Sequence, residues 1–162
     1  MQRIEDIMTR DVECADPGQT LREAAERLKS RDIGSMPVCE GRRVVGIITD
    51  RDITIRAVAE GKDVETTRVS EIMSKDVIAC RTHDTVDDAQ KIMHDRQIRR
   101  LPVVDDQGEL RGYLALARIA RSEDEREAGK VIKGISASQP PKPMETEEGA
   151  DKTRGRGRRK TG

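Results

Sequence analysis

The sequence contains almost no aromatic residues. Tyr113 is the only Phe, Tyr or Trp among 162 residues, so a hydrophobic core must be built from Val, Ile, Leu, Met and Ala. Proteins that bind single-stranded nucleic acid without sequence preference stack the bases on aromatic side chains. The shortage of aromatics removes the platform that this kind of binding needs.

Net charge is also missing. The chain has 31 basic and 31 acidic residues, so its formal net charge is zero although 38% of its residues are charged. Such a chain has no general electrostatic attraction to nucleic acid or to an anionic membrane surface. The local exception is a basic Arg/Gly run over residues 154–160, which follows an acidic stretch over residues 145–151.

Cysteine and histidine are too few and too scattered to predict a site. Cys14, Cys39 and Cys80 are odd in number and lack C-x-x-C spacing, which argues against a disulfide framework and a zinc site. His83 and His94 have no acid or cysteine at ligand spacing, so we predict no metal site. No Ser or Cys has a base in a matching position, and we therefore predict no catalytic residue and no enzyme.

Long hydrophobic runs are absent. No apolar run approaches the roughly 18 residues of a membrane span, and the first ten residues carry acids instead of a hydrophobic segment. We therefore expect neither a membrane span nor a secretory signal, and a cytoplasmic protein with reduced thiols. The length suits one compact two-unit domain followed by a tail.

An internal repeat is the most informative feature that is present. Residues 7–53 are echoed by residues 72–119, and Gly46 pairs with Gly112. Two equivalent units usually bury their unfinished apolar faces against each other, so the cleft between them is the first place to look for a ligand. Eight further positions recur 65 residues later: Met8, Val12, Thr20, Leu21, Ala24, Ile33, Pro37 and Val38 as Met73, Val77, Thr85, Val86, Ala89, Ile98, Pro102 and Val103.

Each copy predicts the same order of elements. A short strand, over residues 12–15 or 77–80, leads to a threonine, Thr20 or Thr85, which stands three residues before an acid and begins an amphipathic helix. Two apolar runs joined by a glycine turn then predict a β-hairpin. In the first copy a second helix is expected from Asp50 to about residue 60, where Gly61 ends it.

The predicted fold class is therefore α/β (α+β), with two pseudo-symmetric β-α-β-β-α units. We place the first unit at residues 1–62 and the second at residues 63–121. Residues 122–135 are predicted as a C-terminal helix or extension that Ser122 can cap. Residues 136–162 are too polar to offset the entropy cost of ordering and are predicted to form a disordered tail with a basic end.

A strand that runs directly into a helix N-terminus is predicted over residues 46–52. The free N–H groups and the positive dipole end of such a junction suit an anionic or polyhydroxyl ligand. The Thr49 hydroxyl and the Asp52 carboxylate fall on the same side of the first turn, where the carboxylate can accept hydrogen bonds from two vicinal hydroxyls. This arrangement predicts recognition of a ribose.

The same Thr49-x-x-Asp52 spacing also fits a plain capping box. In the second copy the corresponding residues 115–118 are Ala-Leu-Ala-Arg, with neither hydroxyl nor acid. A feature found in one of two equivalent units is more easily explained by a ligand than by the fold, unless the last helix begins later, at Ser122. Both interpretations remain open.

Two adjacent arginines, Arg99 and Arg100, precede a predicted buried strand of the second copy, where the first copy has Gly34 and Ser35. A fixed pair of guanidinium groups is suited to bidentate phosphate contacts. The alternative is a solvated pair of arginines that forms an ion pair with the nearby Asp95, because surface arginines are common. One composite site, with its ribose end from the first unit and its phosphate end from the second, would use both asymmetries.

The repeat resembles the cystathionine-β-synthase (CBS) domain pair, or Bateman module. The resemblance covers about residues 1–120 and rests on Ile-Met-Thr at 7–9, on Met-Pro-Val and Arg-Leu-Pro-Val at 36–38 and 100–103, and on Val-Gly-Ile-Ile-Thr-Asp-Arg-Asp at 45–52. It implies that the units pack through their sheets and that two chains form a flat homodimer. It also implies a regulatory adenosyl ligand, AMP, ADP, ATP, S-adenosylmethionine or a dinucleotide, in the cleft.

The resemblance also assigns residues to the parts of that ligand. A repeat of two units could form a second, equivalent site, the mirror site, with the roles of the two units exchanged. The resemblance implies one ligand per chain, because Arg118 stands where the mirror site would need its ribose acid. The assignments are ribose to Thr49 and Asp52, phosphate to Arg99, Arg100 and Arg51, and the adenine pocket to Ile47, Ile78 and Pro102.

The sequence thus predicts a stand-alone regulatory protein that senses an adenosyl nucleotide, requires no other cofactor and signals through the geometry of a homodimer. Two alternatives remain. One is a dimeric interaction adaptor that needs no small molecule, in which Thr49 and Asp52 only cap a helix. The other is an RNA-associated protein that acts through its basic tail.

Overall fold

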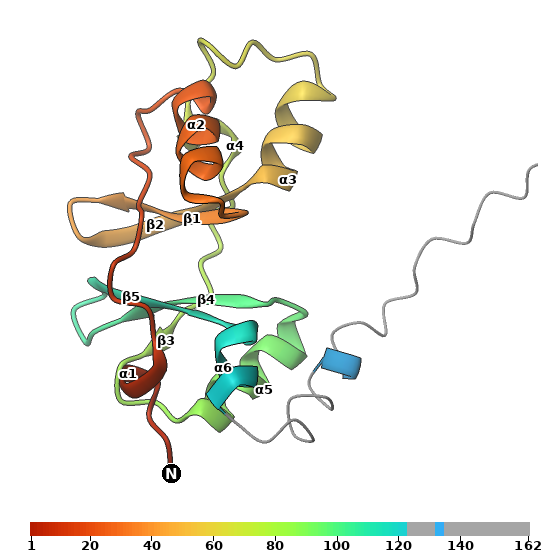
Figure 1. The fold of residues 1–162 in the computed structure, drawn as a ribbon. Coiled ribbons are helices and arrows are strands. Elements are labelled where there is room, and N and C mark those ends of the chain that lie inside the picture. Colours follow the sequence, from red (N-terminus) through yellow and green to blue (C-terminus); the bar gives the residue numbers. More distant parts are fainter. Residues whose placement is uncertain (123–131, 135–162) are drawn as a thin grey trace, which may run out of the picture.

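The computed structural model describes residues 1–122 and 132–134. In this part of the chain, two small sheets lie next to each other and each carries helices on its outer side (Figure 1). The predicted C-terminal extension and the predicted polar tail with its basic run fall mainly on residues 123–131 and 135–162, outside the described residues. No helix within residues 1–122 and 132–134 has the length and hydrophobicity needed to cross a membrane.

Apart from the first strand of each copy, both halves repeat one order of elements, as the sequence predicted. The short helix α1 (Ile4–Ile7) comes first. The first half then contains α2 (Leu21–Arg31), β1 (Ser35–Glu40), β2 (Arg43–Thr49), α3 (Asp50–Asp52) and the π-helix η1 (Ile53–Val58). The second half contains α4 (Val69–Ile72), β3 (Cys80–Arg81), α5 (Val86–Arg96), β4 (Arg100–Val104), β5 (Leu110–Ala115) and α6 (Leu116–Ser122).

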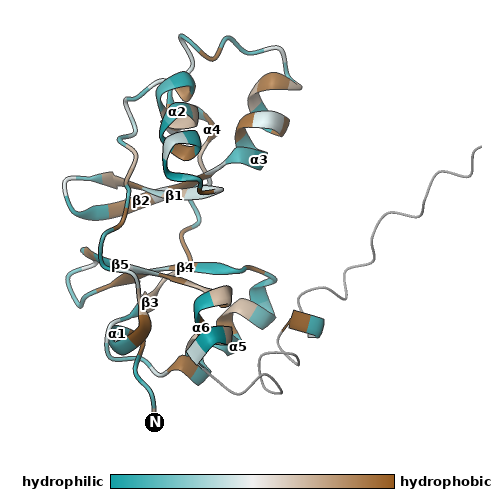
Figure 2. Ribbon diagram, viewed as in Figure 1, coloured by the Kyte–Doolittle hydropathy of each residue, from teal (hydrophilic) through white to brown (hydrophobic). Residues whose placement is uncertain are grey.

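The two long helices begin at the predicted threonines. The Thr20 hydroxyl accepts the N–H of Glu23 at 3.2 Å, and the Glu23 carboxylate accepts the N–H of Thr20 at 2.9 Å. Thr85 and Asp88 form the same reciprocal pair at the start of α5. Each helix buries the predicted apolar stripe, and Figure 2 shows hydrophobic and hydrophilic positions alternating around both. The caps and the stripes are therefore confirmed.

The hairpins are also confirmed. Strand β1 pairs antiparallel with β2, and β4 pairs antiparallel with β5. Gly41 and Gly108 stand in the turns with φ of +59° and +81°, a conformation that side chains other than glycine rarely adopt. The hairpins carry the residues that flank the space between the two halves.

The first strand of each copy is shorter than predicted. Residues 12–15 make only one parallel bridge, between Ala15 and Val38, and residues 77–80 are reduced to the start of β3, which pairs with β4. In the first copy the chain turns after Ala15, the last residue of the predicted strand, where the Asp16 carboxylate accepts the N–H of Gly18 at 2.8 Å. The sheets consequently have two and three strands.

The helix predicted from Asp50 to about residue 60 is divided. Its first turn, α3, is α-helical, and η1 continues with wider bonds, such as that from the Ala59 N–H to the Thr54 carbonyl at 2.9 Å. The Thr54 hydroxyl donates to the Asp50 carbonyl, an acceptor that an α-helical N–H would otherwise use. Gly61 ends the segment with φ of +70°, as expected.

Helix α6 begins at Leu116 and ends at Ser122. The helix of the second half therefore does not begin as late as Ser122, whereas the C-terminal helix predicted from Ser122 onward lies mainly outside the described residues. The Ser122 hydroxyl donates back to the Ile119 carbonyl at 2.9 Å, a bond suited to the end of a helix. The helix of the second half therefore starts at the same place as α3, without a Thr/Asp pair.

The two hydrophobic cores exchange short segments. Helix α1, although first in the chain, packs into the core of the second half, and α4 packs into the core of the first half. Thr9 exchanges two backbone hydrogen bonds with Tyr113, at 2.9 and 2.8 Å, and Ser74 exchanges two with Ile47, at 2.9 and 3.0 Å. The halves are thus joined by two crossing segments as well as by their sheets, whereas the unit boundary at residues 62 and 63 stays a prediction.

Candidate functional site

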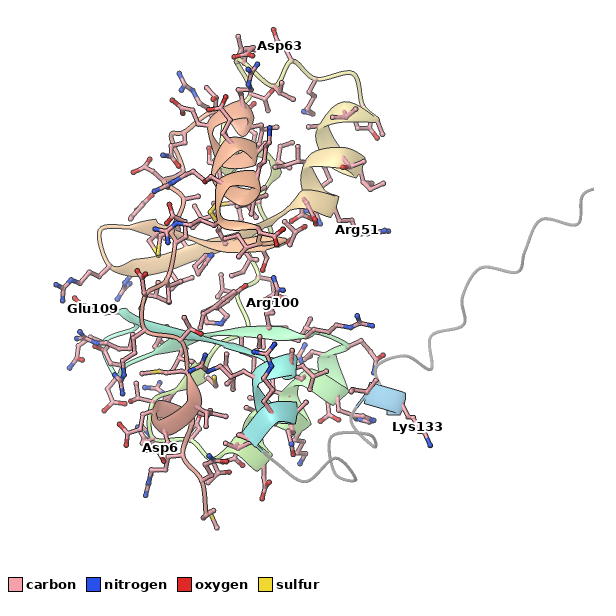
Figure 3. All side chains as sticks on the ribbon, in the orientation of Figure 1. Asp6, Arg51, Asp63, Arg100, Glu109 and Lys133 are labelled. Atoms are coloured by element: carbon pink, nitrogen blue, oxygen red, sulfur yellow. The ribbon has the colours of Figure 1, made fainter. Side chains whose placement is uncertain are left out.

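A cavity of about 770 Å³ lies between the two halves and is lined by side chains from both. All eight residues that the sequence assigned to a ligand line this one cavity. The ribose candidates come from the end of β2 and from α3, the arginine pair from the start of β4, and Figure 3 shows Arg100 directed from β4 into the space between the sheets. The structure therefore brings the predicted residues together, while their roles toward a ligand remain a prediction.

Thr49 and Asp52 form a capping box at the start of α3. The Thr49 N–H donates to Asp52 Oδ2 at 3.1 Å, and the Asp52 N–H donates to Thr49 Oγ1 at 2.9 Å. The capping interpretation is thus confirmed. It leaves the second carboxylate oxygen of Asp52, Oδ1, with only the Arg56 guanidinium at 3.8 Å, so this oxygen can still accept hydrogen bonds from a ligand.

The three predicted phosphate-binding arginines differ in their partners. Among the described residues, the side chains of Arg51 and Arg99 make no hydrogen bond or ion pair, and both are exposed. Arg100 donates from Nη1 to the Ser35 hydroxyl at 3.3 Å. Among the described residues neither Arg99 nor Arg100 forms an ion pair with Asp95, which lies 3.2 Å from His94, so the predicted alternative of a pairing with Asp95 is wrong. None of the three guanidinium groups is neutralised by a described carboxylate within 4 Å.

Tyr113, the single aromatic residue, lines the same cavity from β5. Its hydroxyl lies 2.9 Å from the Ser35 hydroxyl of β1, so the two halves share a hydrogen bond here. Burial raises the pKa of Tyr113, and the hydrogen bond with Ser35 and the positive charge of Arg100 oppose that shift. The tyrosine therefore stays a neutral hydrogen-bonding group at ordinary pH.

The sequence did not assign several other lining residues. Tyr113 is the repeat counterpart of Ile47, which was assigned, so the repeat itself contained the signal. Ser74 and Asp76 line the cavity because their segment crosses from α4 to β3. No local sequence pattern predicts that crossing. The remaining unassigned residues are Gly34, Ser35, Asp50, Gln97 and Ile98.

The mirror position is occupied differently. Arg118, which stands where Asp52 stands in the first half, donates to the carbonyl of Ile7. The equivalent carbonyl in the first half, that of Ile72, accepts from Arg56 Nη1 at 3.0 Å. Each crossing segment is thus bound by an arginine, Arg118 in the second half and Arg56 in the first. Arg56 lies one helical turn after position 52, the equivalent of position 118, so position 52 can carry an acid.

The apolar floor of the mirror position is missing as well. The counterpart of Ile78 is Glu13, whose carboxylate pairs with Arg27 at 2.7 Å and with Arg31 at 3.0 Å. Its side chain is only 17% exposed. A nucleotide base there would have to displace this partly buried ionic group, which argues against a second site of the same kind.

The lining of the main cavity is suited to binding a ligand. It combines apolar side chains, carboxylates and guanidinium groups, a combination suited to a ligand with an apolar ring, hydroxyls and an anionic group. Within residues 1–122 and 132–134, no group of three or more His, Cys, Asp or Glu side chains is placed to hold a metal ion.

Comparison with known proteins agrees with the repeat. The family model "CBS domain" matches the chain twice, at residues 4–58 and 69–125. The CBS domain-containing protein YhcV of Bacillus subtilis is 39% identical over 137 residues, which cover 84% of this chain and 96% of that protein. YhcV therefore consists of little more than the matched region.

Solved structures show the same fold. The crystal structure of Hypoxic Response Protein I with two coordinated zinc ions has a TM-score of 0.70 and 32% identity, and the match covers 76% of this chain and all of that one. Hypoxic response protein 1 comes from Mycobacterium tuberculosis. The CBS domain pair of protein MJ0100, in complex with 5′-methylthioadenosine and S-adenosyl-L-methionine, has a TM-score of 0.67 and 30% identity, covering 75% and 98%. The chain described here therefore belongs to the CBS domain family, and its two halves are a CBS domain pair.

Proposed function

We propose that this chain is a regulatory protein that binds one adenosyl nucleotide in the cavity between its halves. The observation that carries the proposal is the convergence of the predicted residues on one cavity, with a carboxylate from the first half and unneutralised guanidinium groups from the second. Thr49 and Asp52 would hold the ribose, and Arg51, Arg99 and Arg100 the phosphate. Ile47, Ile78 and Pro102 would enclose the adenine.

The comparisons support an adenosyl ligand. The CBS domain pair of protein MJ0100, 30% identical to this chain, was solved with two adenosyl compounds. The apolar lining of the present cavity suits the adenine ring that those compounds share, while its arginines favour a nucleotide with phosphate. AMP, ADP and ATP are therefore our first candidates, and S-adenosylmethionine is the next.

Ligand binding is tested by thermal unfolding in the presence of AMP, ADP, ATP or S-adenosylmethionine. A ligand that binds only the folded chain stabilises it by about 2.7 kcal/mol at a free concentration 100 times its dissociation constant, and we expect at least one adenine nucleotide to do so. Inosine and guanosine monophosphates serve as controls for the base. Unfolding temperatures that stay unchanged with all four compounds would contradict the proposal.

We also propose that two chains associate and that the dimer passes on the state of the cavity. In addition to the family resemblance, the π-helix η1 exposes two large apolar side chains, Ile55 at 49% and Val58 at 59%. Neighbouring exposed apolar residues favour association. Sedimentation velocity should show a dimer for the unchanged chain and a shift toward monomer for Val58→Glu, whereas Glu60→Gln is a matched surface control. A monomer at all concentrations would exclude this part of the proposal.

The second candidate function is a ligand-independent interaction adaptor. It is favoured by one observation, the complete capping box at Thr49 and Asp52, which gives both side chains a structural role without any ligand. The adaptor and the nucleotide sensor differ in the expected behaviour of Asp52→Ala. The adaptor loses only stability, and the sensor also loses ligand affinity.

A further inference from the structure

One hydrogen-bonded group spans the two halves at the cavity. The Ser35 hydroxyl of β1 accepts a hydrogen bond from Arg100 Nη1 of β4 at 3.3 Å and lies 2.9 Å from the Tyr113 hydroxyl of β5. Ser35 and Arg100 are equivalent positions of the repeat, 65 residues apart, so they meet where the halves face each other. All three residues line the cavity.

Arg100 therefore differs from the other two cavity arginines. Within the described part of the chain, the guanidinium groups of Arg51 and Arg99 have no partner that a ligand would have to displace. The guanidinium of Arg100 does have one, the Ser35 hydroxyl, and Ser35 itself is 9% exposed. An anion that binds Arg100 must therefore either share the guanidinium with the Ser35 hydroxyl or replace that hydroxyl as its partner.

The relative strength of the acceptors decides between these outcomes. A phosphate oxygen carries charge, and hydrogen bonds from a guanidinium to a charged acceptor are shorter and roughly twice as strong as those between neutral groups. Bidentate binding of phosphate also needs two N–H groups of one edge of the guanidinium plane. The bond to Ser35, 3.3 Å long and to a neutral hydroxyl, is the weaker competitor.

We infer that Arg100 exchanges partners when the cavity is occupied, leaving the Ser35 hydroxyl and binding a phosphate group of the ligand. The inference rests on the proposed function, because it needs a phosphorylated ligand in this cavity. Its consequence is that occupancy removes one of the hydrogen bonds that join the two halves. A phosphorylated nucleoside would loosen this tie, and an unphosphorylated one such as adenosine would leave it in place.

The sign of the effect of Ser35→Ala on affinity tests the inference. If Ser35 competes for Arg100, its removal strengthens AMP binding by about 2- to 10-fold, the equivalent of one net hydrogen bond, and leaves adenosine binding unchanged. If Ser35 instead holds Arg100 in place for the phosphate, the same change weakens AMP binding. Calorimetric titration of the full chain with AMP and with adenosine measures both affinities.

A double-mutant cycle identifies the arginine involved. In an Arg100→Gln background the effect of Ser35→Ala on AMP affinity should vanish, and in an Arg99→Gln background it should persist. Ser35→Ala also leaves the buried Tyr113 hydroxyl without its partner. The double variant Ser35→Ala, Tyr113→Phe removes both groups and should fold with near-normal stability, so it repeats the measurement if the single variant unfolds.

The outcomes separate the two proposals. Weaker or unchanged AMP affinity in both Ser35 variants, with normal AMP binding by the unchanged chain, would overturn the exchange of partners alone. So would a gain in affinity that persists without Arg100. An unchanged chain that binds neither AMP nor adenosine would overturn the nucleotide-binding proposal and the exchange with it.

Discussion

Replacing Asp52 by Ala is expected to remove nucleotide binding and to leave a folded protein. The carboxylate has two tasks in the proposed site. It accepts the Thr49 N–H through Oδ2 at 3.1 Å, and its other oxygen is free to accept the ribose hydroxyls. Hydrogen bonds to a charged group are worth about 1.5–3 kcal/mol each, so loss of two should weaken binding by about 100-fold or more.

The cost to the fold should be much smaller. Loss of a helix cap typically lowers the free energy of unfolding by about 1 kcal/mol, and the Thr49 hydroxyl still accepts the N–H of residue 52 in the variant. Thermal unfolding and calorimetric titration of the same preparation measure the two effects separately. Asp52→Asn should fall between the unchanged chain and Asp52→Ala, because the amide oxygen keeps an acceptor without the charge.

The capping box at the start of α5 offers a matched control. Asp88 forms the same reciprocal box with Thr85 at the start of α5, at 3.1 and 3.2 Å, and it does not line the cavity. Asp88→Ala should therefore lose similar stability and keep full ligand affinity. If Asp52→Ala and Asp88→Ala behave alike, with affinity unchanged in both, then Asp52 is only a cap and the adaptor becomes the better account.

Gly112→Ala is expected to cause the largest loss of stability among single changes outside the core. A Cβ at position 112 would lie 2.5 Å from Met8 Sδ and 2.9 Å from the Thr9 carbonyl oxygen. The methionine side chain can move, but the carbonyl belongs to the crossing segment, which Thr9 joins to β5 by two backbone hydrogen bonds. Overpacking of this kind costs about 1–3 kcal/mol.

Gly46, the repeat equivalent of Gly112, offers a parallel test, and Gly41 offers a control. Gly46→Ala would place its Cβ 2.5 Å from Met73 Sδ and 3.1 Å from the Ser74 carbonyl oxygen, so it should behave like Gly112→Ala but lose slightly less. Gly41→Asn has open space around it and a residue that tolerates positive φ, so it should be nearly neutral. Denaturant unfolding measures all three. Equal stability of the Gly112 variant and the unchanged chain would show that the crossing segment is not held as described.

The local features of the fold could be predicted because they depend on nearby residues. The caps at Thr20 and Thr85, the two glycine hairpins and the buried stripes of α2 and α5 each follow from spacing within one or two turns. Prediction failed for the first strand of each copy and for the helix that begins at Asp50. Residues 12–15 make only one bridge, and η1 has wider bonds where the Thr54 hydroxyl donates to the Asp50 carbonyl.

The site could be predicted further than usual because the repeat let two copies be compared. A threonine and an acid present in one half and an arginine pair present in the other pointed to a single composite site, and the structure places all of them around one cavity. Thr49 and Asp52 also showed the limit of such reasoning. Their spacing fits capping and ligand binding as alternatives, yet the geometry is compatible with both, because one carboxylate oxygen of Asp52 caps the helix and the other can bind a ligand.

By itself, the amino-acid sequence determined that the chain is a duplicated CBS pair, and it predicted eight of the residues that line the cavity between the halves. Only the tertiary structure decided that the N-terminal segment and the linker cross to opposite halves, that Arg118 is engaged with the Ile7 carbonyl, and that Arg100 meets Ser35. The physical reason is range. Caps, turns and stripes are set by contacts between residues a few positions apart, whereas these contacts join residues far apart in the chain, 65 positions for Ser35 and Arg100 and 111 for Ile7 and Arg118, and they exist only once both halves have packed together.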